Sequence, residues 1–143
     1  DEVTLEAGGI TLRFSRRDFG RRVAAAAGRL GLVDAARTDG DERADLAEIA
    51  IHGHVATPRS ALAAHLDGRR GQLVHDGRDL VYWLRRLVFR DAWLDQQVTD
   101  GHLQPVFTQG RGFTYRSTAT GAPTADGATV PDWSAHAHRG ATA

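Results

Sequence analysis

The chain contains no cysteine, no methionine, no lysine and no asparagine. Without cysteine, disulfide bonds, thiolate zinc sites and cysteine nucleophiles are excluded. All 18 basic residues are arginine, and together with abundant alanine, glycine and aspartate this is typical of a high-GC bacterial gene. Because methionine is missing, Asp1 is not a translation start, and we expect the chain to be trimmed, to be a processed product or to be a piece of something longer.

Long hydrophobic runs and an excess of charge of either sign are also missing. No apolar run approaches the roughly 20 residues that a membrane-spanning helix needs, and the start of the chain lacks the basic and apolar regions of a signal peptide. Eighteen acidic residues balance the 18 arginines, so no overall field draws the chain to nucleic acid or to an anionic membrane. We therefore expect a cytoplasmic protein with no membrane partner.

The chain has 143 residues, of which 41% are hydrophobic, and this is enough for one domain with its own core. Alternating apolar residues predict strands, and apolar residues at helical spacing predict helices. Ser15, Thr57 and Asp76 stand where helix N-caps belong. The expected elements are a strand at 10–14, helices at about 16–30, 42–52 and 58–67, a short strand at 72–75, one long helix or two abutting helices up to about 100, and a β-hairpin over 103–107 and 113–116.

From Ser117 onward small and polar residues dominate the sequence. Such a segment buries too little apolar surface to offset its ordering entropy. We expect residues 1–117 to form a single globular domain and residues 118–143 to be a disordered polar tail, in which Trp133 is the one residue able to anchor it.

The predicted fold class is α+β, a mainly helical small domain with a short N-terminal strand and a C-terminal hairpin. This order of elements is compatible with a winged-helix-like arrangement. Residues 46–51 and 58–66 would be the two helices of a helix-turn-helix, and the hairpin at 103–116 would be the wing. The long helix between them departs from the simplest version of that fold.

The segment 80–94 is apolar on two faces when it is drawn as a helix. Leucines line one face and aromatic residues the other, with arginines at the edges. A helix that is apolar nearly all round is either a central core helix or one that docks a partner. The residues predicted to bind a protein or peptide partner, or a second copy of the chain, are Tyr82, Arg85, Arg86, Phe89, Arg90 and Trp93.

Four of the seven histidines form two His-x-His pairs, of which His52 and His54 flank Gly53. In an extended segment such a pair can present two nitrogen ligands to a divalent transition metal, with His75 as the third. The alternative is that His52 stabilises a helix C-terminus. His136 and His138 lie in the predicted tail, where we expect them to be solvated.

Arginines are densest in the first predicted helix, which carries Arg16, Arg17, Arg21, Arg22 and Arg29 after Arg13. This face could meet phosphates or an acidic peptide. It could also be a solvated face that nearby aspartates balance. A separate set, Arg59, Arg69, Arg70 and Arg111, would contact nucleic acid if the chain were a winged-helix protein.

The favoured interpretation is a non-catalytic binding or accessory subunit that needs no cofactor and docks its partner through the aromatic face of the helix at 80–94. One alternative is a winged-helix nucleic-acid-binding protein. The other is a small enzyme that depends on histidine or a metal and uses His52, His54 and His75. No catalytic residue follows from the sequence, and the chain has no phosphate-binding loop pattern.

Overall fold

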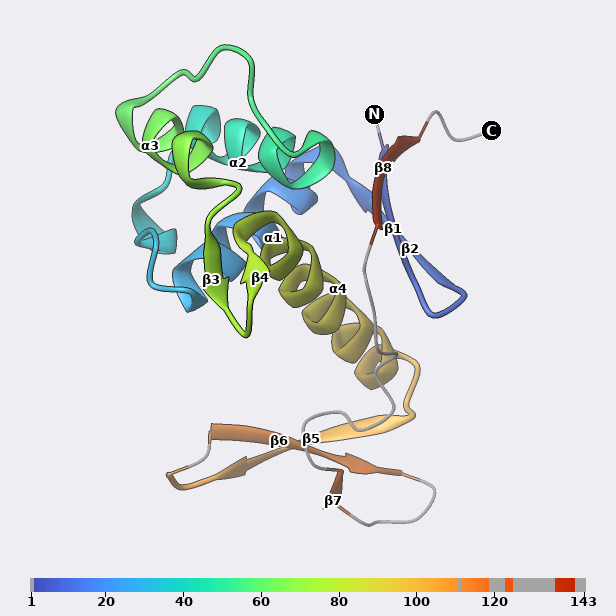
Figure 1. The fold of residues 1–143 in the computed structure, drawn as a ribbon. Coiled ribbons are helices and arrows are strands. Elements are labelled where there is room, and N and C mark those ends of the chain that lie inside the picture. Colours follow the sequence, from blue (N-terminus) through green and yellow to red (C-terminus); the bar gives the residue numbers. More distant parts are fainter. Residues whose placement is uncertain (1, 111, 119–122, 125–135, 141–143) are drawn as a thin grey trace. The chain divides into compact units, whose positions relative to one another are not determined.

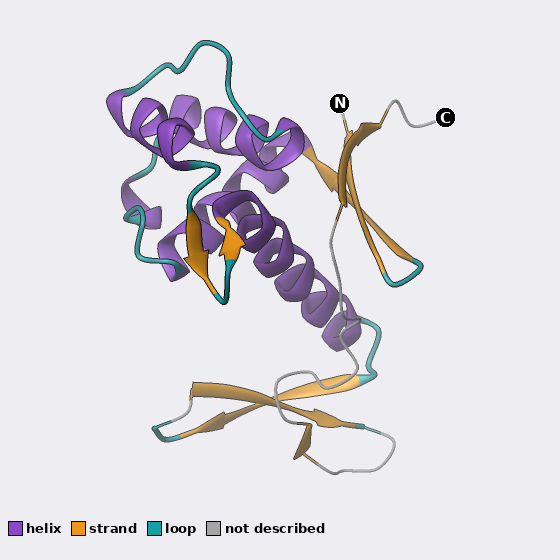
Figure 2. Ribbon diagram, in the orientation of Figure 1, coloured by secondary structure: helices purple, strands orange, loops and turns teal. Residues whose placement is uncertain are grey.

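The structure, a computed structural model, describes residues 2–110, 112–118, 123–124 and 136–140 (Figure 1). Within this part the chain is mixed α+β and mostly helical, with small antiparallel strand groups (Figure 2). Its contacts divide it into two compact units. The first runs from the N-terminus to Phe89 and includes the C-terminal strand, and the second begins at Arg90.

The first unit opens with a hairpin of β1 (Glu2–Ala7) and β2 (Ile10–Ser15). The turn between them is Gly8–Gly9, and both glycines have positive φ, which suits a tight two-residue hairpin turn. Alternate residues of both strands, such as Leu5 and Phe14, are buried, so one face of the hairpin joins the core. The sequence predicted the second of these strands but not the first.

Helix α1 (Arg16–Arg29) follows β2 directly and confirms the helix predicted at 16–30. The Ser15 hydroxyl accepts the Asp18 backbone N–H at 3.1 Å, which caps the first turn. Phe19 and Val23 on its inner face are completely buried. The apolar spacing in the sequence therefore identified the face that packs into the core.

A short 3-10 helix, η1 (Ala35–Arg37), leads to α2 (Gly40–His52). Asp39 and Glu42 form a capping box, in which each side chain accepts the backbone N–H of the other residue. The helix therefore starts two residues earlier than the sequence predicted. Its inner face is fully buried at Leu46 and Ile49.

Helix α3 (Ala61–Arg69) begins later than predicted, because its N-cap is Ser60 and not Thr57. The Ser60 hydroxyl accepts the Ala63 N–H at 3.0 Å. The connection from α2 is therefore the eight residues 53–60, whereas a helix-turn-helix has a turn of about 3–4 residues. The mixed α+β class holds, but this spacing does not match the predicted helix-turn-helix.

A small hairpin, β3 (Leu73–His75) and β4 (Arg78–Asp79), precedes α4 (Leu80–Thr99). Asp79, not Asp76, caps α4, because its carboxylate accepts the Tyr82 N–H at 2.8 Å. Asp76 lies in the hairpin turn with a φ of 50°. The single helix α4 confirms the first of the two options that the sequence left open.

The second unit contains the end of α4 and a three-stranded antiparallel sheet of order β5-β6-β7. These strands are β5 (Leu103–Thr108), β6 (Gly112–Ser117) and β7 (Pro123–Thr124). The pairing of β5 with β6 is the hairpin that the sequence predicted. Phe107 on β5 is 68% exposed.

The region predicted to be a disordered tail contains β7 and also β8 (His136–Gly140), which pairs antiparallel with β1. Strand pairing satisfies backbone groups at a sheet edge and needs no apolar composition, so the composition gave no sign of either strand. Trp133 lies outside the described part, as do all of residues 119–122, 125–135 and 141–143. Among the helices described, none has the length and apolar character that crossing a bilayer requires.

Candidate functional site

The predicted aromatic docking face is largely covered by the chain itself. Phe89 is completely buried and Trp93 is 7% exposed, while Tyr82 is half-buried. Arg86 lies over the Trp83 ring, 5.1 Å from its centroid, and donates to the Tyr82 hydroxyl at 3.4 Å. Docking through this face stays a prediction, with fewer exposed aromatic atoms than the sequence suggested.

Arg85, one of the predicted partner-binding residues, has an internal structural role. Its guanidinium donates to the Ala50 carbonyl at 2.6 Å and to the Ile51 carbonyl at 3.0 Å. These carbonyls belong to the last turn of α2, where backbone acceptors lack helical partners. Burial lowers the pKa of Arg85, and the charge of Asp79 opposes that shift. Arg85 therefore joins α4 to the end of α2.

The three histidines predicted to bind a metal come from the end of α2, the loop after it and β3, and a metal site there stays a prediction. His52 ends α2, and its Nε2 lies 3.2 Å from Glu48 Oε2 one turn earlier. His54 follows in the loop and lines, with His52, a pocket of about 520 Å³, and His75 lies on β3. Within the described residues, no three histidine or carboxylate side chains could hold a metal ion.

The arginines predicted to contact nucleic acid have local partners in the described residues. The Arg59 guanidinium lies 3.5 Å from Asp41 and 3.7 Å from the buried Asp45. Arg70 donates to the backbone carbonyl of Asp67 at 2.7 Å. Arg69 donates to Gln72 at 3.3 Å, and Arg111 lies outside the described residues.

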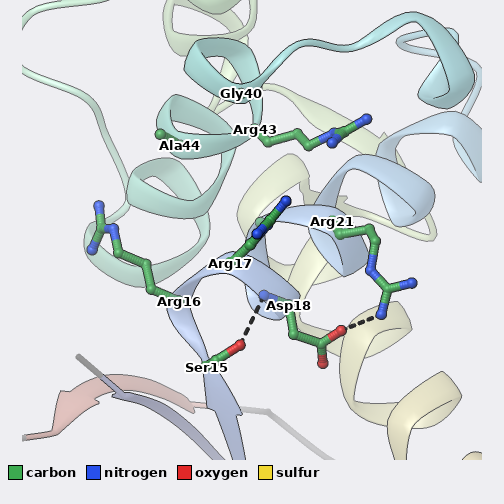
Figure 3. A pocket seen from close by; sticks show the side chains of 9 residues that line it. Ser15, Arg16, Arg17, Asp18, Arg21, Gly40, Arg43 and Ala44 are labelled. Atoms are coloured by element: carbon green, nitrogen blue, oxygen red, sulfur yellow. Dashed lines mark hydrogen bonds and ion pairs between the residues drawn. The ribbon is translucent and has the colours of Figure 1, made fainter.

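A cleft of about 830 Å³ lies between the start of α1 and the first turns of α2 (Figure 3). Four arginines and a single carboxylate line it, and we call it the arginine cleft. Its lining residues are Ser15, Arg16, Arg17, Asp18, Gly20, Arg21, Gly40, Arg43 and Ala44.

Two of the four arginines are ion-paired. Arg21 pairs with Asp18, and Arg16 pairs with Glu48 on α2. Arg43 donates through Nε to the Thr38 hydroxyl at 3.1 Å. Arg17 is exposed and makes no ion pair with any described residue. Figure 3 shows Arg16 extending away from the side on which Arg17, Arg21 and Arg43 lie.

Asp18 is the only acidic residue in the lining. Burial alone would raise the pKa of Asp18, but hydrogen bonds from Arg21 and Arg22 outweigh this effect and hold the pKa below its usual value. Asp18 is therefore ionised at neutral pH and occupied by these two arginines. Of the four arginines in the lining, Arg21 is paired with Asp18 and Arg16 with Glu48. Arg17 and Arg43 are therefore the two whose charge no described carboxylate balances.

A close approach between the two helices forms the cleft. A Cβ placed on Gly20 of α1 would lie 3.0 Å from the Arg43 carbonyl oxygen on α2. Glycine at this position therefore lets the two backbones approach and brings Arg43 beside the first turn of α1. Ser15 and Asp39 already cap the two helices, so the arginines supply the positive charge of the cleft.

The sequence identified part of this site. It singled out Arg16, Arg17 and Arg21 as a basic stretch, and the cleft contains all three. It missed Arg43, because nothing local indicates that the first turns of α2 pack beside α1. The one available signal was Gly20, a helix-breaking residue inside a strongly predicted helix.

No protein-family model matches the chain, and no curated protein or solved structure that was compared with it does either.

Proposed function

We propose that this protein is a non-catalytic binding domain that holds an anionic group of a protein or peptide partner in the arginine cleft. The observation that carries the proposal is the collection of four arginine side chains in one cleft with one carboxylate. Guanidinium groups bind anions through charge-assisted and often bidentate hydrogen bonds, which are about twice as strong as neutral ones.

The side chains that line the cleft can bind a ligand, but none of them is an evident catalytic group. Its single hydroxyl, Ser15, is engaged as the cap of α1. Arg17 and Arg43, which come from different helices, have no carboxylate partner among the described residues. A group bound between them would be held from two sides, as an anchoring contact requires.

The proposal is tested by isothermal titration calorimetry at low ionic strength with two probes, inorganic phosphate and an octaglutamate peptide. The variant is R17A/R43A, and the matched control is R13A/R69A. The control removes the same charge from residues outside the cleft lining. We expect the cleft variant to lose at least tenfold in affinity for a probe that binds, and the control to lose less than threefold.

Two results would contradict the proposal. One is that neither probe binds the wild-type chain, and the other is that both variants lose affinity equally. The second result would mean that the chain attracts anions through diffuse surface charge.

Nucleic-acid binding and histidine-dependent catalysis stay predictions. Asp41 and Asp45 hold Arg59, and Asp67 holds Arg70, so the described structure adds no support for a nucleic-acid surface there.

A further inference from the structure

We infer that the arginine cleft takes a single phosphate monoester dianion. This inference rests on the proposed function and names the class of anion. The two positive charges of Arg17 and Arg43, which have no carboxylate partner among the described residues, match a phosphate monoester. Such a group carries about −1.5 to −2 at pH 7 and has three acceptor oxygens. Arg17 and Arg43 supply planar donor forks that fit phosphate oxygens.

A carboxylate fits the cleft less well than a phosphate. It carries one charge and two oxygens, so it would balance only one of the two positive charges of Arg17 and Arg43. The cleft also already contains one carboxylate, that of Asp18, which Arg21 and Arg22 bind. Arg17 and Arg43 therefore fit a ligand that carries more than one negative charge.

A long polyanion also fits poorly, because acidic residues adjoin the cleft. Gly40 in the lining is flanked by Asp39 and Asp41, and Glu42 follows in the same turn. The Asp41 side chain is 73% exposed. A chain of phosphates that runs past Gly40 would bring further negative charges beside these carboxylates, which would repel them. A compact group avoids that repulsion.

Arg43 is held in place before any ligand binds. Its Nε donates to the hydroxyl of Thr38, a residue only 6% exposed, and that hydroxyl donates to the Ala35 carbonyl at 2.8 Å. This arrangement leaves the two Nη groups of Arg43 as the free ends of the side chain. A preformed donor loses less conformational entropy on binding, so Thr38 acts as a positioning residue for Arg43.

The experiment is a calorimetric comparison of five ligands at equal ionic strength: inorganic phosphate, phenyl phosphate, a phosphoserine peptide, benzoate and a 12-nucleotide single-stranded DNA. We expect phenyl phosphate to bind at least tenfold more tightly than benzoate, and the DNA to bind no more tightly than one phosphate monoester. Inorganic phosphate and phenyl phosphate report on a free small ligand. Tighter binding of the phosphoserine peptide would identify a phosphorylated protein as the source.

Affinity for phenyl phosphate should fall about five- to tenfold between pH 7.5 and pH 5, because the second pKa of a phosphate monoester is about 6. Affinity for benzoate should change little over the same range. T38V should weaken phenyl phosphate binding several-fold, T38S should restore it, and T38V should have no further effect when combined with R43A. A merely structural role of Thr38 would give the same loss in both backgrounds.

Benzoate binding as tightly as phenyl phosphate would overturn the inference, and so would DNA binding more tightly than any monoester. In the first case the proposed function would stand, provided that R17A/R43A still lost at least tenfold in affinity. In the second case the proposed protein or peptide partner would be wrong as well. If no anion bound at all, both the inference and the proposed function would fall.

Discussion

The backbone at Gly20 lies so close to α2 that a Cβ there would come within 3.0 Å of the Arg43 carbonyl oxygen. We predict that G20A separates the two helices and destabilises the protein by about 1–2 kcal/mol, because overpacking against a backbone atom outweighs the helix propensity that alanine adds. Urea unfolding measures the loss, and calorimetry should show weaker phosphate binding, since Arg43 moves with α2.

The matched control for this substitution is G68A on α3. Gly68 is also helical, but a Cβ there would have no neighbour within 4 Å. Alanine should therefore stabilise the protein by about 0.5–1 kcal/mol through helix propensity and a smaller unfolded-state entropy. Equal effects of G20A and G68A would show that the close approach to Arg43 does not limit the residue at position 20.

Arg85→Met should destabilise the protein by about 1.5–3 kcal/mol, because the Ala50 and Ile51 carbonyls lose a charged donor. Methionine keeps most of the apolar stem, so the measured loss reports on the hydrogen bonds. The comparison is Arg17→Met, an exposed arginine that makes no ion pair with a described residue, and which should cost less than about 1 kcal/mol. Anion binding by the folded R85M protein should equal that of wild type.

The carboxylate of Asp18 should stabilise the protein at neutral pH and lose this effect in acid. Its pKa is lowered in the folded state, so its contribution is present above the unfolded value, about 3.8, and disappears as the pH falls through the folded value. Thermal unfolding of wild type and D18N should therefore differ at pH 7 and converge as the pH falls below the folded pKa of Asp18. A difference that stays constant across this range would contradict the role given to Arg21 and Arg22.

D18N should also strengthen anion binding in the cleft, by about two- to fivefold at low salt. The substitution removes the only carboxylate in the lining and releases Arg21 toward the ligand. The sign is opposite to that of R17A, although each variant changes one charge. Titration with phenyl phosphate at two salt concentrations measures the effect, which should shrink as salt rises. Weaker binding by D18N would mean that Asp18 mainly orients Arg21.

Local sequence patterns predicted the elements that local interactions determine. The spacing of Phe19 and Val23 after the Ser15 cap gave α1 within one residue at its C-terminus, and the length of the apolar run gave α4. The start of α3 was wrong because Thr57 and Pro58 form a good start signal, yet Ser60 makes the actual cap. Competing caps three residues apart cannot be ranked without the packing of the loop.

Interactions between distant segments explain most of what the sequence did not reveal. The pairing of β1 with β8 joins the two ends of the chain. Arg43 reaches the cleft only because α2 packs on α1. The acceptors of Arg85 are on α2, 34 and 35 positions away in the sequence. The sequence therefore gave no sign of this internal role and favoured an interface role for Arg85. A pattern within one helix cannot show which carbonyls a distant helix end will present.

Helix α2 is held at both ends, by the capping box of Asp39 and Glu42 and by the guanidinium of Arg85. Helix ends without such contacts fray, and their amides then exchange with solvent through local opening. With both ends held, the amides of α2 should exchange mainly when the whole first unit unfolds. The arginine cleft would then be lost only when that unit unfolds. Arg43 would line the cleft in every folded state of the unit.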